Sequence, residues 1–118
     1  MSTNANINVK TADGKYKAIY LHWDGDMALG ILQKHYNSQE QAEALVALGD
    51  LSSLRSRLAP EAGEQHSFSN AVEDVCIFYG RDRGETGCGY VTSHKPVTDF
   101  NYCYVFEDGE WKNGDNHG

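Results

Sequence analysis

The sequence contains no apolar run long enough to cross a membrane. A transmembrane helix needs about 20 consecutive apolar residues, and no stretch of the 118 residues approaches that length. The first residues, 1–6, also lack the basic region and the apolar segment of a secretory signal. These absences predict a cytosolic protein that makes no membrane contact.

Paired cysteines are also missing. The chain has three cysteines, Cys76, Cys88 and Cys103, and none of them forms a Cys-x-x-Cys motif. An odd number without close pairs is atypical of both a disulfide framework and a zinc site. Cys76 and Cys103 lie within apolar runs, where a free cysteine packs as a small apolar side chain. We therefore expect reduced, structural thiols and no cofactor.

Positive charge is scarce. Ten Lys and Arg residues face 17 Asp and Glu residues, which gives a net charge of −7. Loose, sequence-independent binding to nucleic acid or to an anionic membrane needs an excess of positive charge, so we exclude both. Two kinds of partner stay open: a protein with a basic surface, and a small anionic ligand held by a local basic site.

Motifs of known catalytic sites are absent as well. The sequence has no nucleophile elbow, no zinc-hydrolase motif and no phosphate-binding loop, since the glycine-rich segment 84–89 lacks the lysine of such a loop. His22, Asp24 and Asp26 are metal-ligand types, but no further ligands follow at a defined spacing. His22 with a carboxylate could form an acid–base pair. We nevertheless predict neither an enzyme nor a metal site.

What the sequence does contain begins with a predicted hairpin and two helices. Apolar and polar residues alternate over 5–10 and again over 15–23, on either side of a turn at Asp13-Gly14. Apolar residues then recur every three or four positions over 27–36 and 39–48. The alternation predicts an antiparallel hairpin with one wet face on its first strand, and the longer period predicts two helices.

Further strands and turns complete the predicted fold. The expected strands lie over 75–79, 90–92 and 101–107, with one more after the Asp108-Gly109 turn. We predict one α+β domain over 1–118, an antiparallel sheet of four to six strands with a helix pair on one face. Residues 113–118 are polar and are expected to be a flexible tail.

The densest group of chemically capable side chains lies where the hairpin meets the first helix. Four of them are candidate ligand contacts: Tyr20, His22, Trp23 and Asp24. Asp24 is also suited to cap the following helix. A purely structural role is the alternative, because an aromatic strand followed by an Asp-Gly turn is common in folded proteins.

All four arginines of the chain fall into two Arg-x-Arg pairs, Arg55 with Arg57 and Arg81 with Arg83. In an extended backbone, side chains two residues apart point the same way, so each pair can form a two-pronged contact. Guanidinium groups match phosphate oxygens in geometry and charge. The pairs therefore predict local anion sites, with paired surface charges as the alternative.

Several motifs resemble a family of small phage-encoded proteins. They follow one another along most of the chain: Ile19-Tyr20-x-His22-Trp23-Asp24-Gly25, Gly30-x-Leu32-x-x-His35-Tyr36, Leu48-Gly49-Asp50-Leu51-Ser52-Ser53-Leu54, Arg81-Asp82-Arg83-Gly84-Glu85, and Phe100-Asn101-Tyr102 with Gly109-Glu110-Trp111. Leu21 and Asp26 depart from the family, in which cysteine and tyrosine are commoner. The family includes or borders the phage sponge that defeats Thoeris immunity by sequestering a cyclic ADP-ribose isomer. The resemblance assigns no ligand contact to an individual residue.

The resemblance implies a phage origin, action in the host cytoplasm and a binding role in immune evasion. With the arginine pairs, it predicts a protein that sequesters a phosphate-bearing immune signalling nucleotide without cleaving it, either a cyclic ADP-ribose isomer or a cyclic oligonucleotide. The alternative is an anti-CRISPR-like or other inhibitor that contacts a host protein through its acidic surface.

We also expect a homo-oligomer, at least a dimer, with ligand sites between protomers. Aromatic residues are numerous on the predicted strands, and the segment 50–74 is long for a chain of this size to cover alone.

Overall fold

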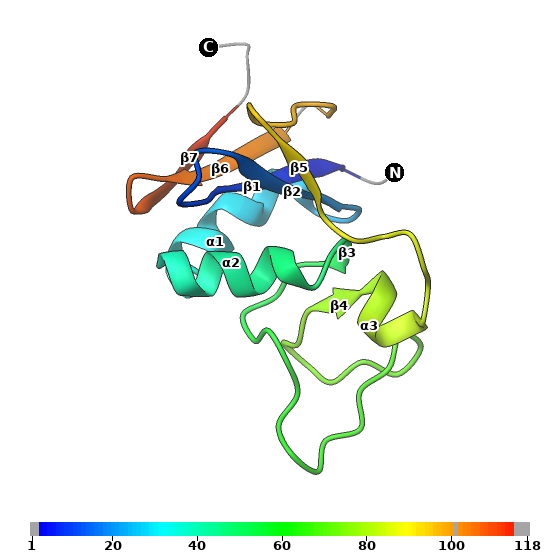
Figure 1. Ribbon diagram of the computed structural model, residues 1–118. Coiled ribbons are helices and arrows are strands. Elements are labelled where there is room, and N and C mark those ends of the chain that lie inside the picture. Colours follow the sequence, from blue (N-terminus) through cyan, green and yellow to red (C-terminus); the bar gives the residue numbers. More distant parts are fainter. Residues whose placement is uncertain (1–2, 101, 115–118) are drawn as a thin grey trace.

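A mixed β-sheet of seven strands forms the centre of the molecule (Figure 1). The computed structural model describes residues 3–100 and 102–114. The strands are β1 (Ala5–Lys10), β2 (Tyr16–Leu21), β3 (Leu51–Ser53), β4 (Ile77–Phe78), β5 (Val91–Ser93), β6 (Tyr102–Glu107) and β7 (Glu110–Asn113). The helices are a 3₁₀ turn η1 (Gly25–Met27), α1 (Ala28–His35), α2 (Gln39–Ala47) and α3 (Tyr79–Arg83). The α+β class is confirmed.

The sheet is mixed, whereas the sequence analysis expected an antiparallel one of four to six strands. Its order is β4-β3-β2-β1-β6-β7, with β5 also paired to β2. The β1–β2 hairpin is antiparallel, as predicted, and places Ile7 opposite Ile19. However, β1 pairs with β6 and β2 pairs with β3 in parallel. The alternation of apolar and polar residues predicts that a segment is a strand, but it does not predict which strand it pairs with. Parallel partners are separated by a long crossover connection, so the sequence near a strand does not identify them.

The helix pair covers one face of the sheet (Figure 1). Leu32 of α1 and Leu45 of α2 are fully buried in one core with the inward side chains of β1 and β2. The Ser38 hydroxyl caps α2 by accepting from the Gln41 N–H at 3.1 Å. No helix among the described residues is long and apolar enough to span a bilayer.

The opposite face of β1 is covered as well, so the predicted wet face is wrong. Asn6 and Asn8 are 5% and 0% exposed. The segment 94–100, which we call the strap, runs across them. The Asn8 amide accepts from the Val97 N–H at 2.8 Å and donates to the Val97 carbonyl at 3.1 Å, and Asn6 accepts from the Asp99 N–H at 2.8 Å. These amides supply the pairing that a neighbouring strand would otherwise give.

The glycine that the fold needs near η1 is Gly25 and not Gly30. A side chain at Gly25 would meet the Thr3 carbonyl oxygen at 2.6 Å and the Ala5 side chain at 2.9 Å. A side chain at Gly30, by contrast, would meet nothing within 4 Å. Gly30 is solvent-exposed on α1.

The segment from β3 to α3 extends beyond the helix pair, at the bottom of Figure 1. Its connection 54–76 has no helix, and Tyr36 anchors it by donating to the Arg55 carbonyl at 2.6 Å. At the C-terminus β7 continues through Asn113, and the Gly114 N–H donates to Cys103. The predicted tail therefore starts too early, and its remaining residues, 115–118, lie outside the described residues.

Candidate functional site

A cleft of about 310 Å³ opens on the face of the sheet that the helix pair leaves free. Its floor is β2, one wall is the strap, and the other is the glycine loop 84–89 with the start of β5. The residues that line it include Ala18, Tyr20, Asp50, Gly87, Gly89, Val91, Asp99 and Phe100. We call this space the cleft.

Tyr20 on the floor of the cleft is held by a defined hydrogen-bond chain. The Asn4 side-chain amide donates to the His22 carbonyl at 2.8 Å and to the Tyr20 hydroxyl at 3.0 Å, which identifies the Asn4 atom as the nitrogen. The Tyr20 hydroxyl also shares a hydrogen bond with His22 Nδ1 at 2.5 Å. Burial raises the pKa of Tyr20, so the phenol stays protonated.

A row of rings continues on both sides of Tyr20. Phe100 of the strap lies 5.2 Å from the Tyr20 ring at a 47° tilt, and the His22 ring meets Trp23 edge-on at 4.6 Å. Trp23 and Phe100 are 45% and 37% exposed, so both present a ring face or edge to solvent. The structure thus brings three of the predicted site residues together, although only Tyr20 among them lines the cleft.

Asp50 closes one end of the cleft. Its Oδ1 accepts from the Tyr20 N–H at 2.9 Å, while its backbone N–H donates to the Cys88 carbonyl at 2.8 Å. β5 pairs with β2 as far as Ala18 and β3 begins at Leu21, so Asp50 fills the gap between them on this edge of β2. Burial raises the pKa of the Asp50 carboxyl, and the hydrogen bond from Tyr20 partly offsets that effect.

Asp24 does not cap the helix that follows it. Its backbone is left-handed, with φ at 57°, and its side chain makes no cap hydrogen bond. The exposed carboxylate lies on the turn between Trp23 and η1. Its backbone carbonyl accepts from the Met27 N–H, so Asp24 shapes the turn through its main chain.

Arg81 and Arg83 lie on the short helix α3, so the extended geometry assumed for this pair is absent. The Arg81 guanidinium is fully engaged: it bonds to the Asp82 carboxylate and to the backbone carbonyls of Leu58 and Cys76 at 2.7–2.9 Å. Arg83 is exposed, pairs with Glu85 at 3.2 Å and lies 4.9 Å from the Phe68 ring. Only Arg83 of this pair is free to change partners.

Arg55 and Arg57 lie on the connection 54–76, directly after β3. Arg57 is in an extended bridge with Val75 and forms an ion pair with Glu64 at 2.5 Å. Among the described residues the Arg55 guanidinium has no hydrogen bond or ion pair, and its backbone carbonyl binds Tyr36. Neither residue lines the cleft.

The sequence analysis did not select four of the residues that shape the cleft: Asp50, Gly87, Asp99 and Phe100. Asp50 and Phe100 do lie in motifs that carry the phage-protein resemblance, which is the one signal for them in the sequence. The glycine loop was visible as a composition, but its position beside β2 depends on the β2–β5 pairing.

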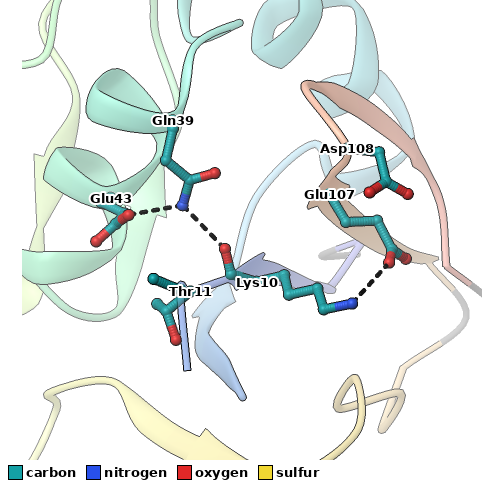
Figure 2. Close-up of a pocket in the computed structure, with 7 residues that line it drawn as sticks. Lys10, Thr11, Gln39, Glu43, Glu107 and Asp108 are labelled. Atoms are coloured by element: carbon teal, nitrogen blue, oxygen red, sulfur yellow. Dashed lines mark hydrogen bonds and ion pairs between the residues drawn. The ribbon is translucent and has the colours of Figure 1, made fainter. Parts of the chain in front are cut away.

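A second hollow, of about 360 Å³, lies between the β1–β2 hairpin, the start of α2 and the β6–β7 turn (Figure 2). Gln39 donates to the Lys10 carbonyl at 2.9 Å and to the Glu43 carboxylate at 2.6 Å, and the Lys10 ammonium pairs with Glu107 at 3.8 Å. Most of these polar groups bond within the hollow, Asp108 pairs with Lys112 outside it, and no aromatic ring is among the described residues that line it. We interpret it as a brace between the hairpin and α2.

The predicted metal-ligand types do not converge. Within residues 3–100 and 102–114, no three His, Cys, Asp or Glu side chains are arranged to hold a metal ion. His22 is engaged with Tyr20 through its Nδ1, and no carboxylate contacts it in the described structure.

No protein-family model matches the chain, and no curated protein or solved structure shows significant similarity to it. The resemblance to small phage-encoded proteins therefore stays a prediction from the motifs, and the geometry of the cleft is the basis for a functional hypothesis.

Proposed function

We propose that this protein is a phage counter-defence protein that binds a phosphate-bearing immune signalling nucleotide in the host cytoplasm and sequesters it without cleaving it. A cyclic ADP-ribose isomer or a cyclic oligonucleotide is the proposed ligand. The observation that supports this most is the cleft beside Tyr20, which combines a flat aromatic boundary, small glycine walls and a fixed carboxylate.

The dimensions of the cleft suit one base of such a ligand. Binding sites for small molecules typically occupy about 300–1,000 Å³, and the cleft lies at the lower end with about 310 Å³. Tyr20 and Phe100 offer ring faces for stacking, which contributes roughly 1–3 kcal/mol per base. A nucleotide would therefore place one base in the cleft and leave its sugar and phosphates outside.

We propose Arg83 as the contact for those phosphates, because its present ion pair is the easiest to exchange. It ends α3 and directly precedes the glycine loop that forms one wall of the cleft. Its ion pair with Glu85 is exposed, and such pairs contribute only about 0–1 kcal/mol, so a phosphate can replace the carboxylate. Arg81 is held by three internal acceptors and would have to give up a structural role.

Calorimetry on the purified chain tests this proposal. We expect measurable binding of at least one ligand among cyclic ADP-ribose isomers and cyclic di- and trinucleotides, and chemically unaltered ligand after heat release. Phe100→Ala and Arg83→Ala should each weaken binding about tenfold or more, because stacking and charge-assisted contacts have that magnitude. Lys34→Ala removes an exposed charge from α1 and is the matched control.

Three results would contradict the proposal. Absence of binding to all these nucleotides would refute it, and recovery of a cleaved ligand would make the protein an enzyme. Capture of one host protein in stoichiometric amount, with no bound nucleotide, would favour the inhibitor alternative.

A further inference from the structure

The orientation of Asp50 gives the cleft a chemical preference, provided that the proposed nucleotide binding holds. Asp50 is fixed on three sides: its Oδ1 accepts from Tyr20, its N–H donates to Cys88, and its carbonyl accepts from the Tyr79 N–H at 3.2 Å. The two main-chain bonds fix the position of the residue, and the bond from Tyr20 orients its carboxylate. A ligand in the cleft must therefore present a hydrogen-bond donor to this carboxylate.

The second oxygen of this carboxylate faces open space. Asp50 Oδ2 makes no hydrogen bond to the described residues. Every fully buried side-chain nitrogen or oxygen in the described structure does have a partner, so Oδ2 must reach solvent. Since Asp50 lines the cleft, the cleft is the space from which a donor can approach this oxygen.

The charge around the cleft points the same way. Two carboxylates line it, Asp50 and Asp99, and no Lys, Arg or His among the described residues does. A phosphate would be repelled there, whereas N–H groups would be attracted, because ionised acceptors form the stronger class of hydrogen bond. The phosphates of a nucleotide therefore belong outside the cleft.

We infer that the cleft selects a base with an exocyclic amino group, as in adenine or guanine, over hypoxanthine, which lacks that group. The amino group donates to Asp50 Oδ2 while the ring lies against Tyr20 and Phe100. Hypoxanthine has no amino group to donate. Where an oxo group replaces the amino group, the oxo oxygen and Asp50 Oδ2 are both acceptors and repel each other.

Matched ligand pairs test this on the wild-type protein. The first pair is cyclic di-GMP and cyclic di-IMP, which differ only in the amino groups. The second is a cyclic ADP-ribose isomer with a free adenine amino group and its deaminated form. We expect the amino form of a binding pair to bind about 10–100-fold more tightly, which is the range for one hydrogen bond to a charged group.

Asp50→Asn tests the role of the carboxylate itself. The asparagine keeps an oxygen for the Tyr20 N–H and turns a donor toward the cleft, so the preference should shrink or reverse in favour of hypoxanthine. Asp108→Asn makes the same chemical change on the distant β6–β7 turn and should leave both affinities unchanged. Thermal unfolding monitored by circular dichroism checks that both variants fold.

The outcomes separate this inference from the proposed function. If neither pair binds and no other cyclic nucleotide does, the proposed function fails and this inference with it. If a ligand binds but its pair members bind equally, or Asp50→Asn folds and leaves the preference intact, this inference alone is overturned. If only cyclic trinucleotides bind, the same comparison is made with cyclic tri-AMP and its deaminated form.

Discussion

Asp82 shows how one carboxylate can organise a long connection without regular structure. Its side chain accepts from the Phe78 N–H and from the Arg81 guanidinium, each at 2.8 Å, and its Oδ2 lies 3.3 Å from His66 Nε2. His66 Nδ1 in turn accepts from the Val72 N–H at 2.9 Å, so His66 is neutral with its proton on Nε2. Asp82 and His66 thereby tie the loop before β4 to α3.

Asp82 should make the stability of the protein sensitive to acid. Burial alone would raise its pKa, but the hydrogen bonds from Arg81 and Phe78 outweigh this and hold the pKa below the ordinary value of 3.8. The ionised form then stabilises the folded state above about pH 4, and this contribution is lost as the pH falls through the lowered pKa. Asp82→Asn should cost roughly 2–3 kcal/mol at pH 7 and flatten the loss of stability at low pH. Urea unfolding between pH 2.5 and 7 measures both effects.

Glu64→Gln serves as the control for this prediction. Glu64 also has a lowered pKa, first because of its hydrogen bond from Arg57, but that pair is on the surface. We expect a much smaller change in the free energy of unfolding at pH 7. Equal losses for the two variants would show that Asp82 is no more than another surface charge.

At the scale of elements, local sequence signals predicted individual helices and the hairpin, but they did not predict the pairing of strands that are distant in the sequence. The β1–β2 hairpin, α1 and α2 follow from alternation, a helical period and the Ser38 cap, all of which act within a few residues. The parallel β1–β6 pair joins a strand near the start of the sequence to one near its end. No local sequence pattern predicts which of the other strands β1 will pair with. The same holds for the cleft: Tyr20 was predicted, whereas Phe100 and Asp50 reach it through tertiary packing.

The strap provides a prediction at the scale of elements. Asn8→Ala would leave the Val97 N–H without its partner on a covered face and remove one of the two donors to the Val97 carbonyl, at a cost of about 1–3 kcal/mol. We expect faster hydrogen exchange at Val97 and Asp99 and earlier proteolytic cleavage within 94–100. Asn37→Ala, at an exposed position after α1, is the matched control. Unchanged exchange in Asn8→Ala would mean that the strap is held by other contacts.

At the scale of the whole molecule, the two long sides of the sheet differ in character. The edge strand β7 presents charged Glu110 and Lys112, which discourage pairing with another strand. β5 is short and uncharged, its Val91 is 55% exposed, and in the described structure it pairs only with β2. Val91 also lines the cleft, so a second copy bound at this edge would lie beside the ligand.

We therefore expect the homo-oligomer predicted from the sequence to be a twofold dimer that pairs β5 with β5. A twofold interface uses the same surface on both copies, which an antiparallel strand pair satisfies. Light scattering at micromolar concentration should report a dimer, and Val91→Lys should convert it to a monomer by burying like charges. Asn113→Lys adds the same charge on β7 and should stay dimeric. A wild-type monomer would refute the expectation.

The way in which Asn6 and Asn8 hold the strap has a consequence for how this protein can evolve. Both amides contact main-chain atoms of Val97 and Asp99, which every amino acid except proline supplies in full. The attachment is therefore indifferent to the identity of the side chains along 94–100, although it fixes their spacing. Substitutions there, including at Phe100, can alter the wall of the cleft while the scaffold persists. Directed evolution confined to these seven positions is thus a direct route to variants with new ligand preferences.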